Sequence, residues 1–182
     1  MKIFQAIPQK SNKKSSIVAR SPLDRRESWT FYHSIYLPSI TYPLPVGNIL
    51  EKDFAKIESR ATRRILPKCG YNRSTPKSVI YGPHQFGGIE FHRLYIEQGL
   101  GQLTFFLKFW HTDFEAGHLL RIATAWNQNM AGTGSSILTD VSTPLPQLET
   151  KWIPSLRTFL HSINSSLELD HTYVPALQRE HD

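Results

Sequence analysis

The chain has 182 residues, of which 40% are hydrophobic and 12% aromatic, so it can bury one core of ordinary size. Its longest apolar-looking run, residues 100–110, is interrupted by glycine, polar and charged residues and is shorter than the ~20 residues of a membrane span. The single cysteine, Cys69, excludes an internal disulfide and fits a reducing compartment. These features predict an intracellular protein, nuclear or cytoplasmic, with no membrane partner.

The net charge of +6 is unevenly distributed along the chain. Residues 1–80 contain 15 Lys and Arg against 5 Asp and Glu, whereas residues 81–182 contain 6 against 10. A basic half of this kind predicts a polyanionic partner, and nucleic acid is the commonest such partner. Part of the charge lies close to the N-terminus, where it can serve solubility alone.

Residues 1–20 are basic and contain no acidic residue. They lack the uninterrupted apolar stretch of a secretory signal, and we favour a disordered tail over an organelle transit peptide. Ser21 followed by Pro22 then predicts the start of a helix over 22–37, which Pro38 ends. Aromatic and apolar residues recur along this helix at helical spacing, which favours packing into a core over a base-stacking platform. They are Trp29, Tyr32, Ile35 and Tyr36.

A second helix is predicted over 49–65, with the clearest amphipathic pattern in the chain. Its apolar face carries Leu50, Phe54, Ile57, Ala61 and Ile65, and the opposite face carries Lys52, Lys56, Arg60 and Arg63. Four like charges on one face repel each other, so we interpret this face as a binding surface, with plain solvation as the alternative. The same charge continues into the following segment through Arg64, Lys68, Arg73 and Lys77, and these eight residues form the candidate nucleic-acid site.

Residues 66–90 are predicted to form a long connector, with turns where its prolines and glycines occur. Apolar side chains lie between these turns, which predicts an ordered, packed segment and not a solvated linker. The pattern also allows a short β-hairpin that pairs residues 79–81 with 89–91.

Three further helices are predicted, over 91–110, 113–130 and 151–164. Gly99 and Gly101 suggest that another backbone packs closely against the first of these helices. A capping box over 112–115 predicts the start of the second helix, and the glycine-rich segment 132–135 predicts its end. The prediction is therefore a mainly α, bundle-like domain over 21–166, followed by an extended and truncated C-terminal end over 167–182.

The sequence lacks the patterns of common catalytic and metal sites. No two aspartates are adjacent, so the paired carboxylates that hold the two metal ions of a polymerase are missing. There is likewise no zinc-protease motif, phosphate-binding loop or nucleophile elbow. We therefore assign no catalytic residue, no metal site, no cofactor and no small-molecule substrate.

Several short motifs occur in a specific order over residues 20–182. They are Arg26-Glu27-Ser28-Trp29 to Tyr42-Pro43-Leu44-Pro45, Leu66-Pro67-Lys68-Cys69-Gly70-Tyr71-Asn72-Arg73, Tyr81-Gly82-Pro83, Phe86-Gly87-Gly88, Glu97-Gln98-Gly99, Trp152 to Ile163 and Leu177-Gln178-Arg179-Glu180. This order resembles the region downstream of the polymerase core in the reverse transcriptases of eukaryotic non-LTR retrotransposons.

The resemblance implies a thumb-like and post-thumb helical segment that helps to hold template and primer. In that family of RNA-directed DNA polymerases, the fingers and the palm with its Asp-Asp motif would lie before residue 1. We therefore expect a catalytically inactive fragment whose residual role is nucleic-acid binding. The alternatives are a stand-alone RNA- or DNA-binding module that uses the same basic face, and a protein-interaction scaffold that uses the aromatic stripes.

Overall fold

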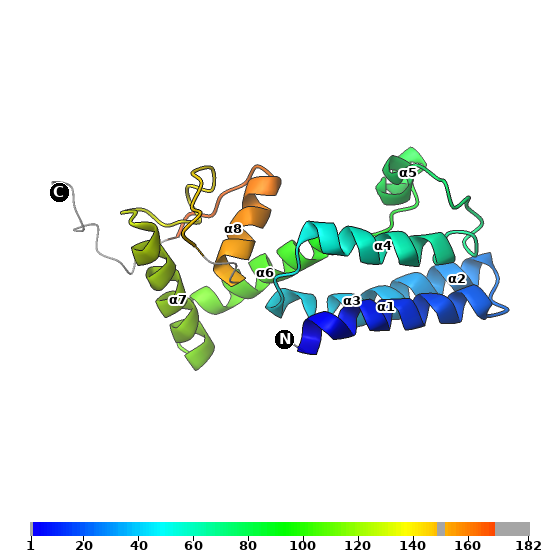
Figure 1. Ribbon diagram of the computed structural model, residues 1–182, viewed down its shortest axis with the longest axis horizontal. Helices are drawn as coiled ribbons and strands as arrows, with labels where there is room; N and C mark the ends of the chain where they lie inside the picture. The colour runs from blue at the N-terminus through cyan, green and yellow to red at the C-terminus, as the bar shows by residue number, and fades with distance from the viewer. Residues whose placement is uncertain (1, 149–151, 170–182) are drawn as a thin grey trace. The chain divides into compact units, whose positions relative to one another are not determined.

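The computed structural model describes residues 2–148 and 152–169, and these residues form helices and connecting segments without any β-strand (Figure 1). The protein is therefore mainly α, as predicted. The helices are α1 (Lys2–Arg20), α2 (Arg25–Phe31), α3 (Leu37–Thr41), α4 (Glu51–Ile65), α5 (Lys77–Tyr81), α6 (Leu94–Trp110), α7 (Glu115–Ala131) and α8 (Trp152–Ser162). A π-helical turn, Tyr32–Tyr36, joins α2 to α3, and short 3-10 turns cover Leu44–Val46 and His84–Phe86.

The chain divides into two compact units, residues 1–98 (unit 1) and residues 99–182 (unit 2), with the boundary inside α6. The sequence predicted a single domain over 21–166. Length and composition cannot distinguish one apolar cluster from two, because the division depends on which apolar residues meet. In unit 1 the buried cluster extends from Ile7 to Leu94, and none of the described residues of unit 2 belongs to it.

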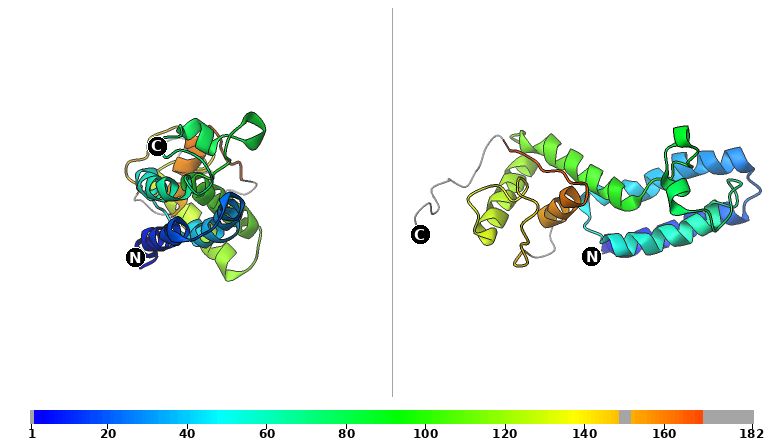
Figure 2. Two further views of the ribbon diagram at one scale, coloured as in Figure 1. Left: turned by 90° about the vertical axis from the view of Figure 1, so that its right-hand side faces the viewer. Right: turned by 90° about the horizontal axis from the view of Figure 1, so that it is seen from above.

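The N-terminal segment is a helix and not the disordered tail that the sequence predicted. Helix α1 packs along α4, and the two lie next to each other in Figure 1 and in the left view of Figure 2. Its inward side carries Ile7, Ser11, Ser15 and Val18, all buried and spaced by three or four residues. The prediction failed because two of these four are serines, so hydrophobic periodicity alone does not reveal the buried side.

Helices α2 and α3 form one continuous helical run with the π-helical turn between them. Asp24 caps this run, since its carboxylate accepts from the Glu27 backbone N–H (2.7 Å) and the Glu27 side chain accepts from the Asp24 N–H (2.9 Å). The predicted cap at Ser21 and the predicted stop at Pro38 are therefore wrong. Pro38 has no backbone N–H with which to donate a helical hydrogen bond. The helix nevertheless continues through Pro38, with a π-helical turn shortly before it.

Of the residues predicted to pack into a core, Tyr32 and Tyr36 are buried in unit 1, Trp29 is partly buried against them, and Ile35 is exposed. Tyr32 stacks on Phe91, with ring centroids 3.9 Å apart, and its hydroxyl accepts from the His92 backbone N–H at 3.1 Å. The Tyr36 hydroxyl lies 2.8 Å from the Ser11 hydroxyl. Burial raises the pKa of Tyr36 to about 12, so this phenol stays protonated and can donate a hydrogen bond.

The predicted β-hairpin is not formed, because residues 77–81 are helical (α5). Residues 89–91 still pair with this segment: the backbone N–H groups of Ile89 and Phe91 donate to the carbonyls of Val79 (2.7 Å) and Ile80 (2.9 Å). A side chain at Gly88 would overlap the Gly82 carbonyl, since a Cβ there would lie 2.0 Å from that oxygen. The two segments are therefore hydrogen-bonded to each other, but not as the β-hairpin that the sequence predicted.

Unit 2 contains α7, α8 and the part of α6 that begins at Gly99. A Cβ at Gly99 would lie 2.1 Å from the ring of Phe159 on α8, so this glycine accommodates an aromatic side chain and not the backbone that the sequence suggested. The predicted capping box is absent, because α7 begins at Glu115 without a side-chain cap. The predicted end is confirmed, since Gly132 caps α7 in the left-handed conformation.

The segment between α7 and α8 is held by side-chain contacts to its backbone. The Arg157 guanidinium donates to the carbonyls of Ile137 (2.9 Å) and Asp140 (3.0 Å). After α8, the Leu167 N–H donates to the Leu138 carbonyl at 2.9 Å. Most of the predicted extended C-terminal end, residues 170–182, lies outside the described residues.

Candidate nucleic-acid interface

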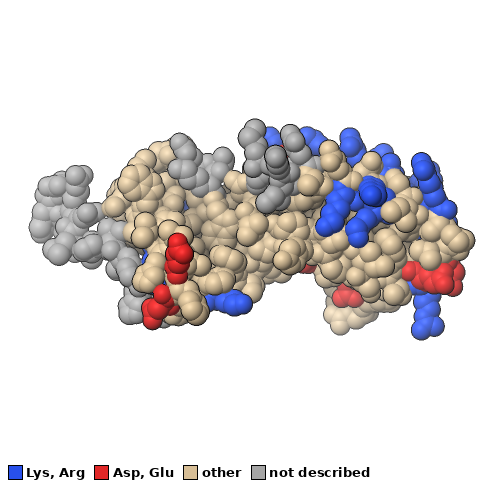
Figure 3. Space-filling model, turned by 90° about the horizontal axis from the view of Figure 1, so that it is seen from below, with Lys and Arg blue, Asp and Glu red and all other residues tan. Residues whose placement is uncertain are grey.

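Helix α4 docks as its amphipathic pattern predicted. Phe54, Ile57, Ala61 and Ile65 are buried, whereas Leu50, which precedes the first turn, is 49% exposed. The opposite side of the helix carries four exposed cations, and we call this row the crest: Lys52, Lys56, Arg60 and Arg63. Lys and Arg side chains also gather over unit 1 on the face drawn in Figure 3. The crest is held in place because the buried face fixes the rotation of α4.

Two of the eight candidate cations have contacts inside unit 1 instead. The Arg64 guanidinium donates to the carbonyl and side-chain oxygens of Asn12 and to the Ser15 hydroxyl. The Lys68 ammonium donates to the Ser21 carbonyl at 2.7 Å. Both side chains therefore tie α1 to α4 and to the turn after it. The structure does not bring them together with the crest.

The remaining two candidate cations, Arg73 and Lys77, line a hollow of about 500 Å³ beside α4 together with Arg63. We call it the α4–α5 hollow, because α4 and α5 form its two sides. It is lined by Ala55, Glu58, Ser59, Thr62, Arg63, Leu66, Arg73, Thr75, Lys77, Ser78, Ile80, Tyr81 and Arg93. Arg63 thus belongs both to the crest and to the hollow.

Among the residues that the structure describes, only one acidic side chain lines the α4–α5 hollow, and neutral donors already hold it. The Glu58 carboxylate accepts from the Tyr81 hydroxyl at 3.2 Å and from the Leu94 backbone N–H. Burial raises the pKa of Glu58 above its usual range, although these two hydrogen bonds and the nearby Arg93 and Lys77 charges oppose the shift. Burial, followed by the Glu58 charge, also raises the pKa of Tyr81. The hollow is therefore strongly cationic on balance.

Arg93 is the one cation of the hollow that the sequence did not assign to the site. Its guanidinium pairs with Glu51 (2.7 Å) and lies over the Tyr81 ring, 5.9 Å from the centroid. No local sequence pattern indicates this residue, because it follows α4 by about thirty positions. Folding of the connector brings it to the hollow.

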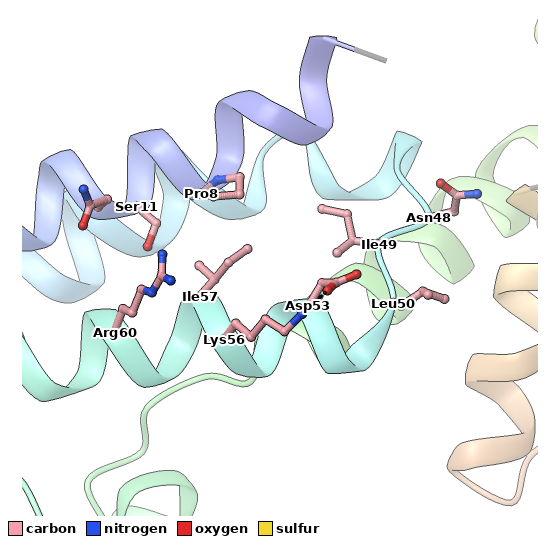
Figure 4. A pocket seen from close by; sticks show the side chains of 10 residues that line it. Pro8, Ser11, Asn48, Ile49, Leu50, Asp53, Lys56, Ile57 and Arg60 are labelled. Atoms are coloured by element: carbon pink, nitrogen blue, oxygen red, sulfur yellow. Dashed lines mark hydrogen bonds and ion pairs between the residues drawn. The ribbon is translucent and has the colours of Figure 1, made fainter.

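A second hollow, of about 490 Å³, lies on the other side of α4 against α1 (Figure 4). Its lining is largely apolar, with Pro8 from α1, Ile57 from α4 and Ile49 and Leu50 from the segment before α4. Lys56 and Arg60 of the crest also line it, and Lys56 pairs with Asp53 there at 3.1 Å. The crest of α4 is thus a cationic row between one apolar and one cationic hollow.

Helix α7 in unit 2 buries a polar side and exposes an apolar one. Its buried side is polar: Arg121 donates to the carbonyls of Trp110 (3.1 Å) and Thr112 (2.9 Å), and the Thr124 hydroxyl to the carbonyl of Leu120 (2.8 Å). Its exposed side is apolar, with between half and two thirds of each large side chain accessible. These side chains are Leu119, Ile122, Trp126 and Met130, and we call them the α7 face.

Within the described residues, no group of three or more His, Cys, Asp or Glu side chains is arranged to hold a metal ion. No helix there is long and apolar enough to cross a membrane. Comparison with protein-family models, with curated proteins and with solved structures found no match to this chain.

Proposed function

We propose that the protein binds the backbone of RNA or DNA through the crest of α4. In this proposal the chain is a catalytically inactive fragment of a non-LTR retrotransposon reverse transcriptase, from the region after the polymerase core. The sequence contains no adjacent aspartates for two-metal catalysis, so binding without polymerisation is the expected activity. A stand-alone nucleic-acid-binding module would use the same cations.

The observation that carries this proposal is the concentration of unneutralised cations on one helix and beside it. Unit 1 contains 16 Lys and Arg against 7 Asp and Glu, a net charge of +9, whereas unit 2 has 5 against 8, a net charge of −3. Of the crest cations, only Lys56 has an ion-pair partner among the described residues. A row of cations held at fixed spacing by a packed helix matches the regular charge of a nucleic-acid backbone.

Binding through phosphates should be largely independent of sequence and steeply dependent on salt. If each of the four crest cations meets one phosphate, the slope of log affinity against log salt should be roughly −3 to −4. We would measure this slope by fluorescence anisotropy with labelled RNA and DNA oligonucleotides. The double variant Arg60→Glu, Arg63→Glu should weaken binding and flatten the slope while the helix content measured by circular dichroism stays unchanged.

The matched control is Lys10→Glu, Lys13→Glu, which reverses two exposed charges on α1 and leaves its buried residues intact. Point variants are needed here because deletion of residues 1–20 would remove a packed helix from unit 1. If the α1 variant abolished binding and the α4 variant had no effect, binding would lie on α1 and the proposal would be wrong.

The α7 face favours a second candidate function, a scaffold that binds an apolar partner helix. Ile122 and Trp126 are 65% and 60% exposed, and a contiguous apolar face of this kind is uncommon on a monomeric protein. The Arg60→Glu, Arg63→Glu variant separates the two candidates. It should weaken nucleic-acid binding and leave a contact made by α7 unaffected.

A further inference from the structure

We infer that the α4–α5 hollow holds one unpaired nucleotide of a single strand whose neighbouring phosphates lie along the crest. This inference rests on the proposed function and adds to it the kind of nucleic acid and the residues that select it. It extends the interface from the row on α4 to a pocket that also includes Arg73, Lys77 and Tyr81.

The lining of the hollow matches the two chemical parts of a nucleotide. Arg63, Arg73 and Lys77 present cationic groups suited to a phosphate, and neither arginine has a hydrogen-bond or ion-pair partner among the described residues. Two apolar residues of the lining, Leu66 and Ile80, are at least 95% buried. The aromatic ring of Tyr81, which also lines the hollow, suits the flat face of a base, as in the pockets that receive unstacked bases.

Several hydroxyl groups also line the hollow. Ser59, Thr62 and Ser78 lie there, and the Thr62 hydroxyl donates to the Glu58 backbone carbonyl. Hydroxyl groups are common partners of phosphate and sugar oxygens. The hollow therefore offers apolar, hydrogen-bonding and cationic groups to one ligand.

The volume of the hollow and its continuity with the crest select a single strand. About 500 Å³ lies within the range of small-ligand pockets, so one nucleotide can enter. A duplex keeps its bases stacked inside, and extrusion of one base costs a few kcal/mol, so a duplex can bind only the crest. Because Arg63 belongs to both surfaces, a strand with one nucleotide in the hollow continues directly onto the phosphate row, which a free nucleotide cannot use.

The test compares two neutralising double variants that each remove two exposed positive charges. Arg73→Gln, Lys77→Gln alters the hollow, and Lys52→Gln, Lys56→Gln alters the crest outside it. Each is titrated with a single-stranded oligonucleotide and with the duplex of the same sequence at fixed salt. We expect the hollow variant to lose roughly tenfold in affinity for the single strand and less than about twofold for the duplex, and the crest variant to lose affinity for both equally.

A third variant tests the space itself without a change of charge. Ser78→Trp places a large side chain in the hollow and should weaken single-strand binding while duplex binding stays the same. If all three variants lowered single-strand and duplex affinity in parallel, or if a free nucleoside monophosphate bound as tightly as the strand, the inference would be overturned and the proposed function would stand. Failure of the unaltered protein to bind either oligonucleotide would overturn both.

Discussion

Helices α4 and α7 are both amphipathic, and they use their two sides in opposite ways. Helix α4 buries Phe54 and Ile65 and exposes cations. In contrast, α7 buries Arg121 and Thr124, whose polar groups find backbone carbonyls, and exposes Ile122 and Trp126. The comparison shows that amphipathicity alone does not say which side of a helix faces the core. A polar side can be buried when each polar group has a hydrogen-bond partner.

The two units differ in net charge, just as α4 and α7 differ in the side chains that they expose. Unit 1 has a net charge of +9 and unit 2 of −3, so a polyanion is attracted to the first and repelled by the second. An apolar partner, in turn, would gain more at the α7 face than at the charged crest.

The largest expected effect concerns the buried side of α4. Phe54 is fully buried, so Phe54→Ala should lower the free energy of unfolding by about 3–5 kcal/mol. Phe86→Ala is the matched control in the same unit, since Phe86 is 81% exposed and its loss should change stability by less than about 0.5 kcal/mol. Hydrogen exchange should show the loss of protection in α1 and α4. An equal loss in α8 would contradict the division into two units.

A smaller effect is expected from Glu58, the acidic group of the α4–α5 hollow. Its pKa is raised in the folded state, so the folded protein holds this proton to a higher pH than the unfolded chain does. Its contribution to stability is therefore full below the unfolded pKa of about 4.3 and is lost as the pH rises through the raised value. Urea unfolding at a series of pH values should show this loss in the unaltered protein.

Glu58→Gln should lack this component of the pH dependence, because glutamine does not titrate. The difference between the two proteins isolates Glu58 from other groups such as His33, whose pKa burial lowers. Parallel stability curves for the two proteins over the acidic range would mean that Glu58 titrates as in the unfolded chain.

The smallest effect on stability is expected at the α7 face. Ile122→Gln, Trp126→Gln replaces two exposed apolar side chains, so the free energy of unfolding should change by less than about 1 kcal/mol. Nucleic-acid affinity should not change either, since these residues belong to the acidic unit. Analytical ultracentrifugation with and without the substitutions would reveal any self-association through this face. A large loss of stability would instead mean that the α7 face belongs to a core.

Several features of the fold followed from the sequence because they depend on local residues. The strict apolar face of α4 gave its position and orientation, and α4 begins at Glu51 within two residues of the prediction. The end of α7 at Gly132 also followed, since a glycine adopts the left-handed conformation without strain. The aromatic spacing likewise indicated that Tyr32 and Tyr36 are core residues.

Other features depend on contacts between distant segments, and the sequence missed them. Helix α1 buries serines whose partners, Tyr36 and Arg64, lie 25 and 49 residues away. The same holds for the candidate site: sequence placed eight cations together, but Arg64 is held by α1 and Lys68 by Ser21. Charge patterning shows which side of a helix is cationic, but not which cations already have partners.

The sequence by itself thus determined the helical class, the basic character of unit 1 and the cationic row on α4, because each follows from residue spacing within one segment. Only the tertiary structure decided that α5 closes a hollow against α4, that Arg93 joins it and that α7 exposes its apolar side. These depend on long-range packing, where hydrogen-bond satisfaction and shape decide which of two compatible sides is buried.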